Sequence, residues 1–258
     1  MHICAHSNGT HTEGAAHVLP GLRTLSEAWT PAAGAVVPAV LLTVRPRPLA
    51  ESSDSYPPGK GDDAAVTSEC IAEAIAACPL PAWWLGGAGP AGGAVRAPCL
   101  GAVCLRTSPN AVSKRTTRWS GTNPVYVTGE AALACRRLVA PAAAWDGASD
   151  DDASPGHLLV DLPSVDREDD GGALIAHRTF FGVDAAGGAS ALAAGVVRAG
   201  EAAGGAAGDH MPRRTITELC YFPDRLSDGL YALSLQCAPV ELDAAPSRPI
   251  MSSLGPAE

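Results

Sequence analysis

The chain has 258 residues, a formal net charge of −9 and a pI of about 5.2. This length suits one domain with a substantial core, and the acidic charge argues against a surface for nucleic acid or an anionic membrane. No apolar run approaches the roughly eighteen residues of a membrane-spanning helix, and the N-terminus lacks the basic and apolar regions of a secretory signal. We therefore expect a single cytoplasmic domain, residues 1–258.

The first notable stretch, residues 6–17, reads HSNGTHTEGAAH. Imidazole and carboxylate are ligands that zinc and manganese accept. On an extended backbone His11 and Glu13 point to the same side, because side chains alternate. We expect Gly14 to bend the chain so that His17 can join them. The alternative is a polar, loop-like N-terminus, but three histidines and a glutamate so close together favour a metal or catalytic site.

The next segments alternate apolar runs with loops. Residues 36–44 (VVPAVLLTV) predict a buried strand, and residues 45–63 predict a loop. Ser68 is expected to cap a helix that ends at Pro79. Residues 100–106 predict another strand, and Thr128 is expected to cap a helix that reaches about Leu138.

Two insertions, residues 79–98 and 184–209, are rich in alanine and glycine. We interpret Trp83-Trp84 in the first as anchors onto the core rather than as a substrate platform. The polar segment 107–126 holds three basic residues, which we interpret as part of a solvated loop rather than an anion site. They are Lys114, Arg115 and Arg118.

The later part of the chain predicts more strands. Residues 157–162 (HLLVDL) form one, and Asp161 and Asp166 are candidates for supporting a site beyond its carboxyl end, with a salt bridge to Arg167 as the alternative. Residues 171–178 are expected to enter a helix. Residues 214–222 and 229–240 predict two strands joined as a hairpin. The spacing predicts an α/β or α+β layering around a mixed sheet with few helices.

The eight cysteines sit singly, often inside apolar runs, and none forms a C-x-x-C pair. We predict reduced thiols rather than a disulfide framework. They are Cys4, Cys70, Cys78, Cys99, Cys104, Cys135, Cys220 and Cys237.

The N-terminal stretch resembles the signature of the metal-dependent cyclase and kynurenine formamidase family, His-x-Gly-Thr-His-x-Asp-x-Pro-x-His. His11 and His17 match that signature, Glu13 replaces its aspartate, and Ala15 replaces its proline. By strict spacing the first histidine falls on Ser7. Residues 242–249 (LDAAPSRP) are similar to the family's Asp-Ala-Ser-Pro-x-Arg ending, so the resemblance spans residues 6 to about 250 apart from the insertions.

The resemblance implies a cyclase-like swivelling β/β/α fold, although family members usually carry further strands ahead of the motif. It also implies one or two divalent ions, zinc or manganese, with His17 as the general acid/base. The implied metal ligands are His6, His11, Glu13, His177 and Glu218. Without the resemblance, His177 reads equally well as a helix histidine bonded to a carbonyl, and Glu218 as the partner of Arg214 in an ion pair.

The position of the first ligand needs a separate argument. A serine hydroxyl is a poor ligand for zinc or manganese, so we predict that His6 approaches the metal instead of Ser7. In a strand, a shift of one residue turns the side chain to the other face, so this prediction requires a bulge around Asn8-Gly9.

The implied function is hydrolysis of a small-molecule amide by a homo-oligomer, a dimer or larger. N-formyl-kynurenine, an aryl formamide, is the implied substrate, or else a related cyclic amide or lactone. The alternative is a catalytically weak or inactive metal-binding member with a binding or structural role, which Ser7 at the first ligand position supports.

Overall fold

The computed structural model describes residues 4–19, 24–28, 36–80, 100–139, 156–183 and 214–254. Trp83-Trp84, Cys99 and the insertion at residues 184–209 lie outside the described residues. No helix in the described part is long and apolar enough to cross a membrane. The helices are α1 (Ala5–Asn8), η1 (Ala15–His17), α2 (Leu25–Ala28), η2 (Leu49–Glu51), α4 (Ser68–Ala77), η4 (Val112–Arg115), α5 (Gly129–Val139) and α6 (Ile175–Phe181). The strands are β1 (His11–Glu13), β2 (Val37–Val44), β3 (Arg47–Pro48), β4 (Ala64–Val66), β5 (Ala102–Thr107), β6 (Tyr126–Val127), β7 (His157–Val160), β8 (Thr215–Glu218), β9 (Gly229–Cys237) and β10 (Ala244–Ser253).

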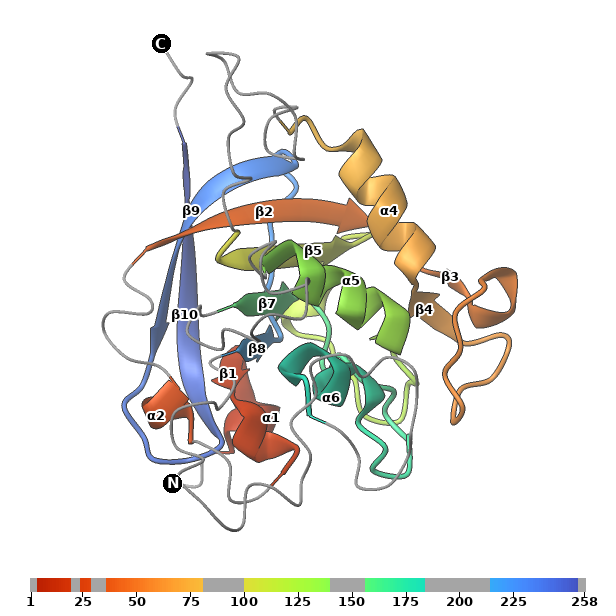
Figure 1. Ribbon diagram of the computed structural model, residues 1–258, viewed down its shortest axis with the longest axis horizontal. Coiled ribbons are helices and arrows are strands. Elements are labelled where there is room, and N and C mark those ends of the chain that lie inside the picture. Colours follow the sequence, from red (N-terminus) through yellow and green to blue (C-terminus); the bar gives the residue numbers. More distant parts are fainter. Residues whose placement is uncertain are drawn as a thin grey trace, which may run out of the picture.

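Seven of the described strands form a closed barrel in the order β1-β10-β9-β2-β5-β7-β8. The barrel closes because β1 pairs antiparallel with both β10 and β8. The run β2-β5-β7-β8 is parallel, whereas β9 pairs antiparallel with β2 and β10. In Figure 1, β9 and β10 form the left side, and α4, α5 and α6 lie to the right. The predicted mixed sheet with few helices is therefore confirmed, and its closure is an added feature.

The alternation of side chains along β2 divides the interior into two apolar clusters. Val40, Leu42 and Val44 belong to the cluster that contains residues of α4, α5 and α6. Ala39 and Leu41 belong to the other cluster, together with residues of β5, β7 and β9. Both faces of β2 are thus buried, which explains why its sequence is almost continuously apolar.

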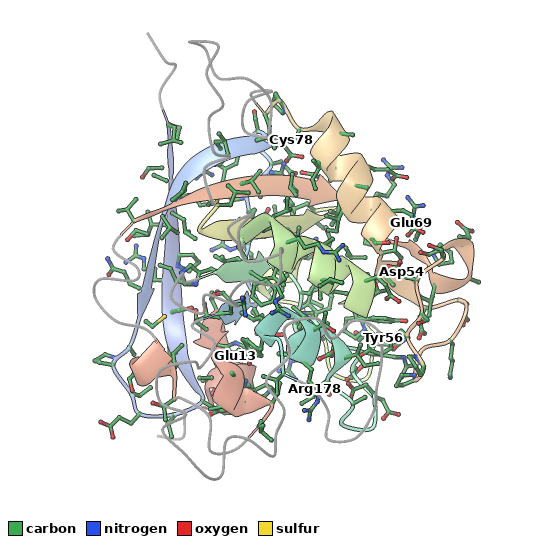
Figure 2. All side chains as sticks on the ribbon, viewed as in Figure 1. Glu13, Asp54, Tyr56, Glu69, Cys78 and Arg178 are labelled. Carbon is green, nitrogen blue, oxygen red and sulfur yellow. The ribbon has the colours of Figure 1, made fainter. Side chains whose placement is uncertain are left out.

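The two longest described helices begin at threonine caps. The side chain of Thr67 accepts a hydrogen bond from the Cys70 amide at the start of α4, so the cap lies one residue before the predicted Ser68. Thr128 caps α5 as predicted, accepting a bond of 3.1 Å from the Ala131 amide. Figure 2 labels Glu69 and Cys78 at the two ends of α4.

The predicted hairpin between residues 214–222 and 229–240 is wrong. β8 pairs with β1 and β7, whereas β9 pairs with β2 and β10. The chain turns away after β8 at Leu219, whose φ is 54° and whose amide bonds to the carbonyl of Leu162. The hairpin partner of β9 is instead β10.

The cysteines that the structure describes form no disulfide with one another; Cys104 and Cys135 are fully buried in apolar surroundings, and Cys220 is 5% exposed. Burial raises the pKa of the Cys135 thiol to about 12. These side chains therefore serve as small core residues.

Candidate metal centre

β1 positions the first two side chains of the site. His11 lies opposite Glu218 of β8, and Thr12 lies opposite Thr217. Because strand side chains alternate, His11, Glu13 and Glu218 share one face, whereas the hydroxyls of Thr12 and Thr217 meet 2.8 Å apart on the other. The pairing of β1 with β8 therefore brings together, from segments far apart in the sequence, three side chains of types that can bind a metal.

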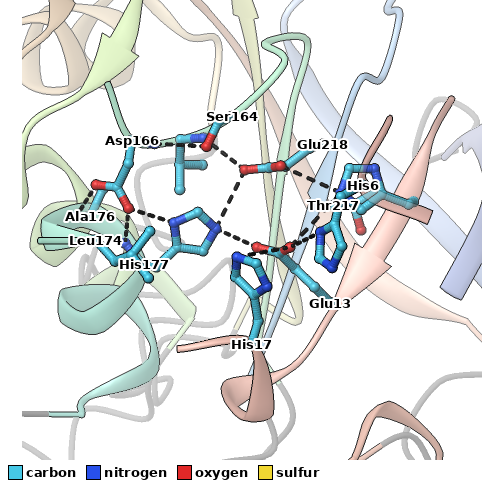
Figure 3. Close-up of polar contacts among 12 residues, drawn as sticks. His6, Glu13, His17, Ser164, Asp166, Leu174, Ala176, His177, Thr217 and Glu218 are labelled. Carbon is cyan, nitrogen blue, oxygen red and sulfur yellow. Dashed lines mark hydrogen bonds and ion pairs between the residues drawn. The ribbon is translucent and has the colours of Figure 1, made fainter. Parts of the chain in front are cut away.

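His177 adds an imidazole from α6. Its Nε2 contacts Oε1 of Glu13 directly and lies 3.5 Å from Oε1 of Glu218. Its Nδ1 is 2.5 Å from Oδ2 of Asp166, so the carboxylate accepts the Nδ1 proton and Nε2 faces the cluster. The same Oε1 of Glu218 also accepts a bond of 2.7 Å from the Val165 amide. The floor of the site is thus buried and fixed from three elements (Figure 3).

His6 and His17 complete the cluster from its more exposed side. Nδ1 of His6 lies 3.1 Å from Oε2 of Glu13, and Nε2 of His17 lies 3.9 Å from the same oxygen. Asp243 stands just before β10, and its Oδ2 is 3.1 Å from His6 Nε2 and 3.2 Å from His17 Nδ1. Asp243 therefore holds both rings from the side away from Glu13.

Oε2 of Glu13 is the centre of the arrangement. Nitrogens of His6, His11 and His17 lie 3.1, 3.8 and 3.9 Å from it, yet this buried oxygen is in hydrogen-bond geometry with none of the described residues. His11 Nε2 is likewise buried and without a hydrogen bond there, since Nδ1 of that ring donates to the Gly9 carbonyl. Buried polar atoms are normally satisfied, so converging unsatisfied ones fit a ligand.

A divalent cation matches this donor set. The ligand atoms of His6, His11 and Glu13 lie within 4.8 Å of one another, and so do those of Glu13, His17 and His177. Imidazole nitrogens and carboxylate oxygens without thiolate suit zinc and manganese. The cation would bond to atoms, such as Oε2 of Glu13 and Nε2 of His11, that form no hydrogen bond within the described residues.

The charges of the cluster perturb one another strongly. The adjacent Glu13 carboxylate raises the pKa of His6 to about 9. Burial opposes a charge on His177, but Glu13 and Asp166 outweigh it and hold its pKa well above the usual value. Burial likewise disfavours ionised Glu13, yet its histidine neighbours keep the carboxyl pKa low. Without a cation, the carboxylates are therefore balanced by protons on imidazoles.

Asp166 is the support behind His177. Its Oδ1 accepts bonds from the Ala176 amide at 2.6 Å and from the Tyr56 hydroxyl at 2.9 Å. Such a carboxylate behind a ligand histidine fixes the ring orientation and raises its basicity. Figure 2 labels Glu13 and Tyr56 in the lower half of the view.

All six site residues expected from the sequence meet in this cluster, although their chemical roles stay predictions. Three local expectations are wrong. Gly14 is extended (φ −113°, ψ −178°), and the turn is made by η1 instead. The bulge at Asn8-Gly9 is absent, because His6 lies on the helix α1, which ends at Gly9 with φ 150°.

The third wrong expectation concerns Asp161, one of the two aspartates that were candidates for supporting the site. The other candidate, Asp166, does contact the site. The alternative for these aspartates, a salt bridge with Arg167, does not form. Arg167 pairs with Asp63 at 2.8 Å. Asp161 instead accepts bonds from Thr107 and from the Lys114 ammonium, 2.8 Å away.

Asp243 was missed by the sequence reasoning. It belongs to the segment 242–249 that resembles the family's ending, but no side chain there was assigned to the site. The available signal was a carboxylate within this motif. What the sequence did not show is the register that places Ala244 opposite Glu13.

No model of a known protein family matches the chain, and no curated protein matches it. Among solved structures, the chain is similar to a protein described as a potential metal-dependent hydrolase with cyclase activity, with 16% identity and a TM-score of 0.51 over 97% of this chain and 80% of that one. This likeness shows the fold, and it confirms the expected fold class.

Two further solved structures are similar at lower TM-scores. One is a predicted metal-dependent hydrolase from Bacillus stearothermophilus, with 14% identity and a TM-score of 0.46 over 97% of this chain and 78% of that one. The other is isatin hydrolase A from Labrenzia aggregata, with 15% identity and a TM-score of 0.47 over 95% of this chain and 72% of that one.

Proposed function

We propose that this protein is a metal-dependent hydrolase that cleaves an amide bond. The proposed substrate is an aryl formamide such as N-formyl-kynurenine, or a related cyclic amide or lactone. The observation that supports the proposal is the environment of Glu13, whose buried Oε2 has three imidazole nitrogens within 3.9 Å and no hydrogen bond to the described residues. A cation-binding site explains this arrangement better than a structural network, which would satisfy its buried atoms.

The proposed ligands of zinc or manganese are His11, Glu13, His177 and Glu218, with His6 in the place where the family signature has its first histidine. A divalent cation makes water more acidic and polarises a carbonyl oxygen. The residues of this chain fix the donor atoms: Gly9 orients His11, and Asp166 orients His177.

His17 is the proposed general acid/base. Its Nδ1 faces the Asp243 carboxylate at 3.2 Å, so Nδ1–H donates there and Nε2 is left to take up a proton. Nε2 faces the cluster, 3.9 Å from Oε2 of Glu13. It is thus placed to accept a proton from water and to return it to the leaving amine. Asp243 acts through His17 and is a positioning residue.

The proposal is tested on the full chain, stripped of metal and reloaded with zinc or manganese. We expect one or two ions per chain by mass spectrometry and hydrolysis of N-formyl-kynurenine or isatin. Glu13→Gln should lose both. Glu73→Gln is a matched control. It removes the same negative charge, but from an exposed residue outside the cluster that pairs with Arg47. Absence of bound metal would overturn the proposal. Bound metal without turnover of either compound would favour the non-catalytic metal-binding alternative.

A further inference from the structure

A cavity of about 960 Å³ lies beside the metal cluster. His6 and Asp166 line it on the cluster side, and much of the rest of its wall comes from residues 114–120 and from Tyr221. This volume accommodates a whole small-molecule ligand rather than a scissile bond alone. The part of a substrate that does not react therefore lies against residues outside the cluster.

The acidic residues that line this cavity are already engaged. Asp161 accepts bonds from Thr107 and Lys114, and Asp166 holds His177. Glu168 accepts the amides of Gly121 at 2.5 Å and of Asn123 at 3.0 Å. Asp161 and Asp166 are thus paired with Lys114 and His177, whereas Glu168 keeps its charge and is held by two backbone amides.

Two cationic residues on the same wall are not engaged in this way. Arg115 and Arg118 are exposed, and neither forms an ion pair within the described part of the chain. Lys114, on the same wall, is paired with Asp161. The guanidinium groups of Arg115 and Arg118 therefore remain free to bind an anionic ligand. Guanidinium recognises carboxylates through two parallel hydrogen bonds.

Aromatic side chains accompany the two arginines. The guanidinium carbon of Arg115 lies 5.8 Å from the centre of the Tyr221 ring, and Trp119 lines the same cavity. Flat aromatic surface next to a guanidinium suits a ligand that combines an aryl ring with a negative charge. The segment is also held in place at two points, by Lys114 on Thr107 and Asp161 and by the two amides on Glu168.

We propose that this cavity selects an anionic aryl substrate, whose carboxylate or equivalent group binds Arg115 and Arg118 while its ring lies against Trp119 and Tyr221. The inference rests on the proposed function and names the substrate class of the same site. It replaces the expectation that residues 114–118 are only a solvated loop. In a chain with a net charge of −9, an anion is repelled in general, so local positive charge decides where it binds.

The test is calorimetric binding of 2-aminobenzoate and of its neutral isostere 2-aminobenzamide to the full chain, with and without zinc. We expect 2-aminobenzoate to bind roughly tenfold or more tightly than the amide, in both metal states, as charge-assisted hydrogen bonds require. The double variant Arg115→Gln/Arg118→Gln should lose this preference.

The control is Arg45→Gln/Lys60→Gln, which removes the same charge at two exposed positions that do not line the cavity, and it should keep the preference. Equal binding of the two probes to the unaltered chain would overturn the inference. The inference would also be overturned if 2-aminobenzoate were preferred only in the presence of zinc and the double arginine variant kept this preference. In that case the anion would bind the metal and not the arginines. Binding needs no turnover, so an anion preference in a protein that hydrolyses nothing would refute the proposed function and leave the cavity's specificity standing.

Discussion

Replacing Asp166 with asparagine tests how much the Asp166 carboxylate contributes to holding the His177 ring. The Asp166 carboxylate is 4% exposed and receives donors on both oxygens: the His177 ring and amide on Oδ2, and the Ala176 amide and Tyr56 hydroxyl on Oδ1. An asparagine of the same shape keeps one acceptor oxygen and turns an NH2 group toward donors on the other side. The change therefore removes the charge and creates a donor–donor conflict.

Two magnitudes follow from these contacts. A hydrogen bond to a charged group contributes about 1.5–3 kcal/mol, so we expect the variant to lose stability by about that amount. A carboxylate behind a metal-ligating histidine is worth about 10- to 100-fold in metal affinity. Asp166→Asn should therefore weaken zinc binding by that factor, because His177 becomes less basic and loses its fixed orientation.

The assay is zinc titration against a competing chelator, with thermal unfolding of the same samples. Asp170→Asn is the matched control, because Asp170 accepts the amides of Gly172 and Leu174 and lies 3.4 Å from the Tyr56 hydroxyl but does not touch His177. It should lose some stability and keep its zinc affinity. If both variants bind zinc like the unaltered chain, or lose affinity equally, the role assigned to Asp166 is refuted.

Three other changes test the rest of the site. His17→Ala should lower kcat by roughly 10²- to 10⁴-fold and leave the metal content unchanged, and loss of metal would make His17 a ligand. His6→Ala should weaken metal affinity in the same titration while Ser7→Ala leaves it intact, and the reverse would place Ser7 at the site. The pKa of His6 is raised from 6.5 to about 9 in the metal-free chain, so its stabilising effect is full below pH 6.5 and is lost as the pH rises through 9. The melting temperature of the metal-free protein should accordingly fall between pH 6.5 and 9, and the melting temperature of the His6→Ala variant should fall less over the same range.

The parts of the fold that the sequence predicted are those with a local signal. Both faces of β2, β5 and β7 are buried, so their apolar runs were recognisable. The starts of α4 and α5 were recognisable from polar caps followed by helical spacing, and the α4 cap was wrong by one residue.

β10 could not be predicted in this way. Pro246 and Pro249 argue against a strand, because proline lacks the amide hydrogen that a ladder uses. In the structure, residues 244–246 pair with β1, whereas residues 247–253 pair with β9, so most of the strand is bonded on one side only. Pro249 therefore has an open side, whereas the Pro246 carbonyl accepts a bond from the Ala238 amide, and a local pattern reveals neither.

The cluster was predictable in its members but not in its surroundings. His11, Glu13 and His17 form a compact motif, and the resemblance to a family added His177 and Glu218. The placement of Asp243 and the wall formed by Arg115 and Arg118 depend on pairings between distant segments. Such long-range register leaves no periodic signal in the sequence.

The position of β1 has a consequence for how the protein is made. The Thr10 hydroxyl bonds to the Leu219 carbonyl, 209 residues later, and β1 is enclosed on its other side by β10. During translation, β1 cannot pair with β8 and β10 until nearly all the described chain has left the ribosome. The proposed ligand set is therefore complete only once residue 218 has been made, so a cation would be bound late in folding.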